Sequence, residues 1–191
     1  MASRRRSYSG SRRSYGRPVK TVKYSNETSQ LRSVFLTDSG AVASPMNQAV
    51  VAIPPADIQG LRKAKNFTLR LQYQIRGSFN QPNVAPIYWA LVYVPGGQIA
   101  QNINIAGTQS VGSDPMAPVS FYEPNQNVIM SGVITPDQPV QTNRTRLARN
   151  LNSGDTIQLV YHWFTNGNGA SGTTDVVERQ VVANLNYAIT L

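Results

Sequence analysis

The sequence predicts an all-β protein, namely a single eight-stranded jelly-roll sandwich that follows a disordered basic N-terminal arm. Three features lead to this prediction. Several segments alternate between apolar and polar residues, turns rich in Gly, Pro and Asn separate them, and helical periodicity is almost absent. About eight short strands with so little helix fit a two-sheet sandwich of the jelly-roll type.

The strongest strand predictions rest on strict alternation. In FTLRLQYQI, residues 67–75, every second residue is apolar, which places one face on a core and the other in a polar setting. The segments TIQLVYHWF, residues 156–164, and 181–189 repeat the pattern. Weaker strand candidates occupy residues 31–37, 47–53, 127–134 and 142–149.

Three further segments carry separate expectations. IYWALVYV, residues 87–94, is apolar at every position, which indicates a central strand covered by the core and, in one interpretation, by a neighbouring subunit. A short helix is expected near PPADIQGL, where Pro55 suits a first helical position. Residues 95–126 lack a convincing strand, and long ordered loops usually contact something, so this segment is also a candidate for subunit contact.

Positive charge is concentrated at the N-terminus. The 191 residues carry a formal net charge of +9, yet eight of the 18 Lys and Arg occur up to Lys23, and the first acid is Glu27. The remaining ten basic and nine acidic residues nearly cancel. We therefore divide the chain into an arm, residues 1–28, and a globular body, residues 29–191. The arm has almost nothing to bury, so we expect it to be disordered when unbound.

The composition of the arm indicates nucleic-acid binding, because an uneven basic charge on a globular body is typical of such arms. Arginine binds phosphate in bidentate fashion and stays charged at physiological pH. Tyr8 and Tyr15 either stack on unpaired bases or act only as spacers. No base-reading element is visible, which predicts sequence-tolerant binding. The cations assigned to binding are Arg4, Arg5, Arg6, Arg12, Arg13, Arg17, Lys20 and Lys23.

A mitochondrial transit peptide is an alternative interpretation of the arm, since it too is rich in Arg and Ser and poor in acids. Such peptides form an amphipathic helix. Here Gly10, Gly16 and Pro18 interrupt any helix, and the apolar residues are too few to form a face. The sequence therefore favours the nucleic-acid-binding interpretation.

Two smaller basic clusters lie in the body. LRKAK, residues 61–65, is interpreted as a solvated face. For NRTRLARN, residues 143–150, a solvated face and a secondary contact with nucleic acid or a subunit both stay open, and alternation places the first two of its arginines on one face of a strand. The members of this second cluster are Arg144, Arg146 and Arg149.

The residues that most enzymes use are scarce. The chain has no cysteine and one histidine, His162, which alternates with Tyr161 and Trp163 and is expected on a polar strand face. No acids lie at a recognisable metal-binding spacing, and no GxxxxGK[ST] or GxGxxG motif occurs. The longest apolar run has eight residues, too few to span a bilayer as a helix. We therefore expect no enzymatic activity, no metal or other cofactor, and no membrane insertion.

Three segments of the body resemble capsid proteins of circular Rep-encoding single-stranded DNA viruses, the circovirus-like group. They are IYWALVYVPGG, YEPNQNVIMSGV and RLARNLNSGDTIQLV, which lie behind an arginine-rich start. The match covers most of residues 85–165, and the phrases EPNQNVIMSG and ARNLNSGD are its most specific parts. The arm is somewhat shorter and less dense in arginine than in true circoviruses.

The resemblance implies a single jelly roll whose copies close into an icosahedral T=1 shell around the circular genome. In that family the basic N-terminal segment points inward, binds the DNA and doubles as a nuclear localisation signal. The implied partners are further copies of the chain, the single-stranded DNA genome, nuclear import receptors and a host attachment receptor. The implied locations are the virion and, during assembly, the host nucleus.

The residues leave one other function open: a non-assembling β protein that binds single-stranded nucleic acid without sequence preference. Whether the protein assembles into particles distinguishes this function from that of a capsid protein. An enzyme of the jelly-roll type, such as a cupin, needs several metal-binding histidines and is not supported by the single His162.

Overall fold

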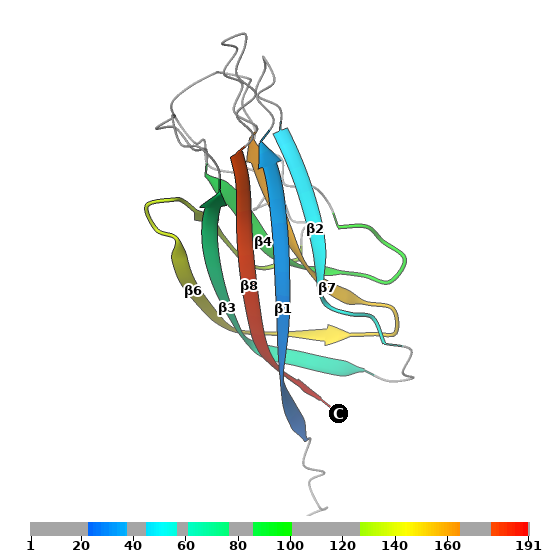
Figure 1. Cartoon of the computed structure of the whole chain (residues 1–191). Coiled ribbons are helices and arrows are strands. Elements are labelled where there is room, and N and C mark those ends of the chain that lie inside the picture. The colour runs from blue at the N-terminus through cyan, green and yellow to red at the C-terminus, as the bar shows by residue number, and fades with distance from the viewer. Residues whose placement is uncertain are drawn as a thin grey trace, which may run out of the picture.

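The computed structural model describes residues 23–37, 45–56, 61–76, 86–100, 127–164 and 177–190. These residues form eight strands in two four-stranded antiparallel sheets (Figure 1). One sheet has the order β1-β8-β3-β6 and the other has the order β2-β7-β4-β5. The strands are β1 Tyr24–Thr37, β2 Pro45–Ile53, β3 Arg62–Arg76, β4 Ile87–Val94, β5 Val128–Ile134, β6 Val140–Leu151, β7 Thr156–Phe164 and β8 Val177–Thr190.

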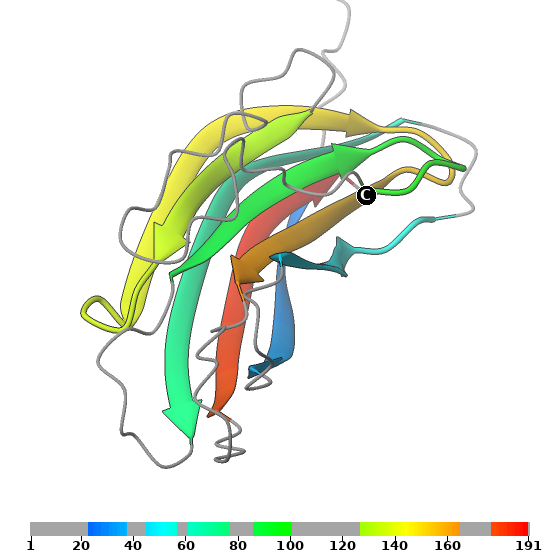
Figure 2. The ribbon, with the colours of Figure 1, turned by 90° about the horizontal axis from the view of Figure 1, so that it is seen from above.

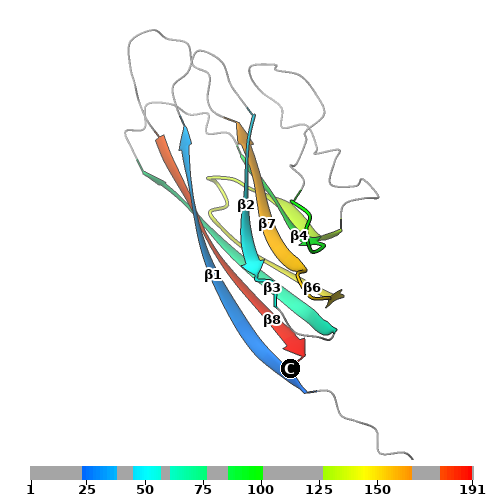
Figure 3. The same ribbon diagram turned by 90° about the vertical axis from the view of Figure 1, so that its right-hand side faces the viewer.

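The strands pair as a nested antiparallel ribbon. β1 pairs with β8, β2 with β7, β3 with β6 and β4 with β5, and the ribbon is rolled so that β3 also pairs with β8 and β4 with β7. The two resulting sheets lie face to face, as the view from above and the side view show (Figures 2 and 3). This connectivity confirms the predicted eight-stranded jelly roll.

The main core lies between the two sheets and follows from the alternation of the strands. Phe67, Leu69 and Leu71 of β3 are fully buried, and they share one core cluster with Leu159 of β7 and Leu185 of β8. Burying one such side chain contributes roughly 1.5–3 kcal/mol. The period-two pattern therefore identified both the strands and the faces that they bury.

β4 is buried on both faces within this one chain. Trp89 and Leu91 lie in the main core, while Tyr88, Ala90 and Val92 form a second apolar cluster on the other face of the sheet. The second cluster also contains Val160, and the partly buried Ala100, Val128 and Val133 pack against it. The expected burial on both faces is confirmed. The interpretation that a neighbouring subunit covers β4 is wrong, because residues of the same chain already do so.

A buried carboxylate closes the end of the sandwich at the turn between β6 and β7. Asp155 accepts hydrogen bonds from the Asn152 N–H (2.7 Å), the Gly96 N–H (2.8 Å) and the Tyr93 hydroxyl (2.6 Å). Burial by itself raises the pKa of Asp155, but these three donors outweigh it and leave the pKa below its ordinary value. The carboxylate thereby ties the turn to the segment that follows β4.

A β-bulge in β3 decides where the basic side chains of that strand point. Asn66 adopts a left-handed conformation (φ 57°), and the register shifts there against both β6 and β8. Ala64 and Phe67 both face the core although they are three residues apart. As a result Lys65, before the bulge, and Arg70, after it, point to the same outward face of the sheet.

Several expectations fall wholly or partly outside the described residues. Residues 1–22 and 101–126 are in this group, and so are four of the eight residues in the segment expected to form a short helix. The four described residues of that segment, Pro54, Pro55, Ala56 and Leu61, are not helical. At the other boundary β1 begins at Tyr24, so residues 24–28, which the sequence assigned to the arm, belong to the sheet.

Candidate nucleic-acid interface

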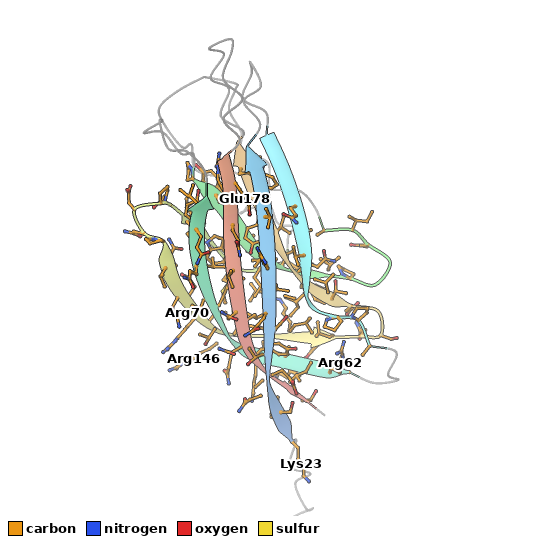
Figure 4. All side chains as sticks on the ribbon, viewed as in Figure 1. Lys23, Arg62, Arg70, Arg146 and Glu178 are labelled. Atoms are coloured by element: carbon orange, nitrogen blue, oxygen red, sulfur yellow. The ribbon has the colours of Figure 1, made fainter. Side chains whose placement is uncertain are left out.

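The arm joins the body at the end of a sheet. Lys23, the one predicted arm cation within the described residues, is exposed and directly precedes β1 (Figure 4). The next residue, Tyr24 on β1, meets a side chain that reaches over β8 from β3: the Lys65 Nζ is 3.6 Å from the centroid of the Tyr24 ring. Such a cation–π contact is worth about 0.5–1 kcal/mol at an exposed site. The arm therefore leaves the body from a point that already carries a cation and an aromatic ring.

Arg144 and Arg146 lie on β6, an edge strand, and both are exposed. Arg144 is paired with Thr68 of β3, so its side chain shares the outward face of the sheet. Arg149 points to the other face, because it is three residues from Arg146 and is paired with the fully buried Ala64. The structure thus keeps two of the three predicted contact residues together and separates the third.

Two outward cations were not singled out from the sequence. Arg70 is exposed on β3 and is paired with Thr142 of β6, which makes it a diagonal neighbour of Arg144. Arg32 is exposed on β1 and donates from its Nη2 to the Gln180 Oε1 at 3.3 Å. Their alternation with apolar residues predicts a polar face. Only the strand order shows that both belong to the same face as the arginines of β6.

Carboxylates are scarce around these cations. The strands of this sheet contain two, Glu27 and Glu178, and Figure 4 shows Glu178 toward the opposite end of the sheet from Lys23. In the part of the chain that the structure describes, neither carboxylate forms an ion pair with Arg70, and the same holds for the arginines of β6. Arg70 and Arg146 project from the same side of the sheet in Figure 4. The arrangement presents unneutralised positive charge to the outside.

His162 does not lie on a polar face, so that expectation is wrong. It is 3 % exposed, and it lies on the face of β7 that carries the second apolar cluster. Its Nδ1 is 3.0 Å from the Asn47 Oδ1, and burial lowers its pKa from 6.5 to about 4. Among the described residues, no group of three or more His, Cys, Asp or Glu is placed to hold a metal ion. The same described residues contain no helix that is long and apolar enough to cross a membrane.

The jelly roll defines the class of fold to which the chain belongs. No protein-family model and no curated protein matches the sequence. A solved structure described as "Crystal structure of decameric BFDV Capsid Protein" is similar to this chain with a TM-score of 0.41 and 6 % sequence identity. The match covers 88 % of this chain and 99 % of that one.

Proposed function

We propose that this chain is a viral capsid protein that self-assembles into an icosahedral shell and packages a circular single-stranded DNA genome through its basic N-terminal arm. The observation that carries the proposal is the division of the molecule. A jelly-roll body with two apolar clusters is joined at Lys23 to a segment that holds seven further cations and no acid.

Each part has the physical properties that a shell subunit needs. The sandwich is tied together by nested strand pairs, and Asp155 closes its β6–β7 end, so it can act as a rigid building block. The arm supplies guanidinium groups that bind phosphate without reading bases. In a shell of roughly 60 copies, closed symmetry gathers all arms in one cavity, where eight charges each give on the order of 480 cations.

The proposal extends to location and partners. The arm would double as a nuclear localisation signal read by import receptors, which places the chain in the host nucleus during assembly and in the virion afterwards. Subunit contacts would involve the segment from residue 95 onward. Ile99, which is 90 % exposed in the single chain, supports this because a partner would bury it.

Electron microscopy of the recombinant full chain tests the proposal. We expect closed particles with circular single-stranded DNA, and protection of that DNA from added nuclease. A variant that lacks residues 1–22 keeps all of β1 and should lose the protected DNA. Full-length protein that stays monomeric at high concentration with DNA would instead establish the non-assembling nucleic-acid-binding function.

A further inference from the structure

The charges of the body are segregated between the two sheets. All ten Lys and Arg after Lys23 lie in the strands of the β1-β8-β3-β6 sheet, together with two acids, so these strands carry 10 − 2 = +8. The strands β2, β4, β5 and β7 contain no Lys, Arg, Asp or Glu. The other seven acids lie in connecting segments. A body that is nearly neutral in total therefore has one cationic sheet and one uncharged sheet.

We propose that the outward face of the β1-β8-β3-β6 sheet is a second binding surface for single-stranded nucleic acid, continuous with the arm. This inference rests on the proposed function and adds the body's own contact to it. It also orients the subunit, because the cationic sheet must then face the packaged strand. The members of this cationic face are Arg32, Lys63, Lys65, Arg70, Arg144 and Arg146.

The spacing of the cationic face allows its charges to act together. Arg144 and Arg146 are two residues apart on one strand, which separates them by about 7 Å. Arg70 is the diagonal neighbour of Arg144 across the β3–β6 pair, at about 7–8 Å. Both separations are shorter than the Debye length of about 10 Å at 0.1 M salt. Their potentials therefore add at the surface, where a phosphate backbone would lie.

The residues between the cations can also bind phosphate and sugar groups. A continuous row of polar residues crosses the sheet from β1 to β3 and ends at Arg144 of β6. Its members are Thr28, Asn186 and Thr68. Amide and hydroxyl groups of this kind make a large share of the hydrogen bonds between proteins and nucleic-acid backbones. Tyr24 adds an aromatic ring at the arm end, where an unpaired base can stack. A single strand leaving the arm thus meets a stacking group first, then the polar row, and then the charge of Arg144.

An ordinary solvated face does not account for this arrangement. Solvated surfaces intersperse charges of both signs, whereas this sheet gathers like charges at close range, which opposes folding. Arg32 and Arg70 are paired in register with neutral residues, Val182 of β8 for the first and Thr142 of β6 for the second. A bound polyanion would relieve the repulsion between the positive charges of the cationic face. The segregation is therefore explained by a ligand and not by the stability of the isolated subunit.

The test measures binding of fluorescently labelled oligonucleotides, dT30 and one of mixed sequence, to the full chain across a range of salt concentrations. The face variant carries Arg70→Gln, Arg144→Gln and Arg146→Gln. We expect the log–log salt slope to fall in magnitude by about 2, from about 0.7 per lost contact. Relative to wild type, its affinity at 50 mM salt should then be reduced roughly 20-fold more than at 200 mM.

A matched control changes the net charge equally but leaves the cationic face intact. The control carries Ala49→Glu, Val51→Glu and Ser131→Glu, at three exposed positions on β2 and β5 of the uncharged sheet. This control should keep the wild-type salt slope. Lys in place of Gln at the three positions of the face variant should restore that slope. Equal salt slopes for the face variant and wild type would overturn the inference. It would also be overturned if the salt slope fell equally in the face variant and the control. Circular dichroism and thermal melting confirm that every variant is folded.

A third variant separates this inference from the proposed function. Arg4→Gln, Arg5→Gln and Arg6→Gln remove three charges from the arm. A smaller salt slope in both the arm variant and the face variant supports both proposals. Loss in the arm variant alone leaves the proposed function standing and overturns the cationic face. Loss in the face variant alone keeps the cationic face and contradicts the role of the arm.

Discussion

The most informative single residue outside the cationic face is His162, because its environment couples folding to pH. Its imidazole lies 3.0 Å from the Asn47 Oδ1 and near the Tyr88 ring, with 6.4 Å between the ring centroids, on a sheet face covered by apolar side chains. Burial disfavours the charged form and lowers the pKa to about 4. The folded chain therefore binds a proton at this site less readily than the unfolded chain does.

This difference predicts acid destabilisation in a defined window. The stabilising effect of neutral His162 is complete above its ordinary pKa of 6.5 and is lost as the pH falls toward about 4, because the unfolded state gains the proton first. A shift of this size corresponds to about 3 kcal/mol. In His162→Gln, the free energy of unfolding should change little between pH 6.5 and 4.5, whereas wild type should lose stability.

Urea denaturation of both proteins at half-unit pH steps measures the effect. Asp155 does not confuse the result, because its pKa lies below its ordinary value of 3.8, so its stabilising effect is lost only at still lower pH. Parallel pH profiles for wild type and His162→Gln across the window would show that the buried imidazole does not titrate as inferred.

At the scale of the elements, alternation and turn residues were sufficient to locate the strands. The apolar run at residues 87–94 coincides with β4, and TIQLVYHWF coincides with β7. The weaker candidates fall on β1, β2, β5 and β6, although residue 127 precedes β5 and β6 begins earlier and ends later than residues 142–149. Local pattern identifies a strand whenever at least one face is buried, because burial is what imposes the period of two.

Two features could not be predicted from local pattern. The first part of β1, YSNETSQ, has no apolar alternation, and it is a strand because β8 pairs with it residue by residue from Tyr24 to Thr37. The bulge at Asn66 is equally hidden, because it depends on the register against β6 and β8. Both are long-range effects, and the bulge determines that Lys63 and Lys65 share the outward face with Arg70.

The start of β1 predicts different consequences for two truncations. Removal of residues 1–22 leaves β1 intact, whereas removal of residues 1–28 deletes five positions that pair with β8. The longer deletion loses the hydrogen bond from the Thr28 hydroxyl to the Asn186 Oδ1 (2.7 Å) and the contact of Lys65 with Tyr24. We expect it to be less stable than the shorter one by about 1–3 kcal/mol.

Guanidinium denaturation of the two truncated proteins at equal concentration gives this difference. The shorter truncation is the matched control, since it removes seven of the eight arm cations and no paired residue of the sheet. If the two unfolding midpoints coincided, the segment from residue 24 to residue 28 would be ordered without contributing to stability, and the boundary at residue 28 would stand.

At the scale of the whole molecule, the sequence alone predicted the concentration of charge in the arm but not the charge pattern of the body. Ten bases and nine acids spread over more than 160 residues look balanced along the chain. Folding gathers the ten bases, because the nested pairing brings β1, β3, β6 and β8 into one sheet and leaves the uncharged strands in the other. The cationic face is therefore a consequence of topology, and no local window of sequence contains it.

This separation makes a prediction for assembled particles that contain nucleic acid. Ultraviolet crosslinking followed by fragmentation mass spectrometry, which locates each adduct at a residue, should find nucleotide adducts in the arm and on residues of β1, β3 and β6. Tyr24 is the expected body site, since an aromatic ring next to Lys65 can stack on a base. Residues of β2, β4, β5 and β7 serve as the internal control, because the strands of their sheet carry no charge and β4 is buried on both faces. Adducts spread equally over both sheets would show that the subunit does not present one face to the packaged strand.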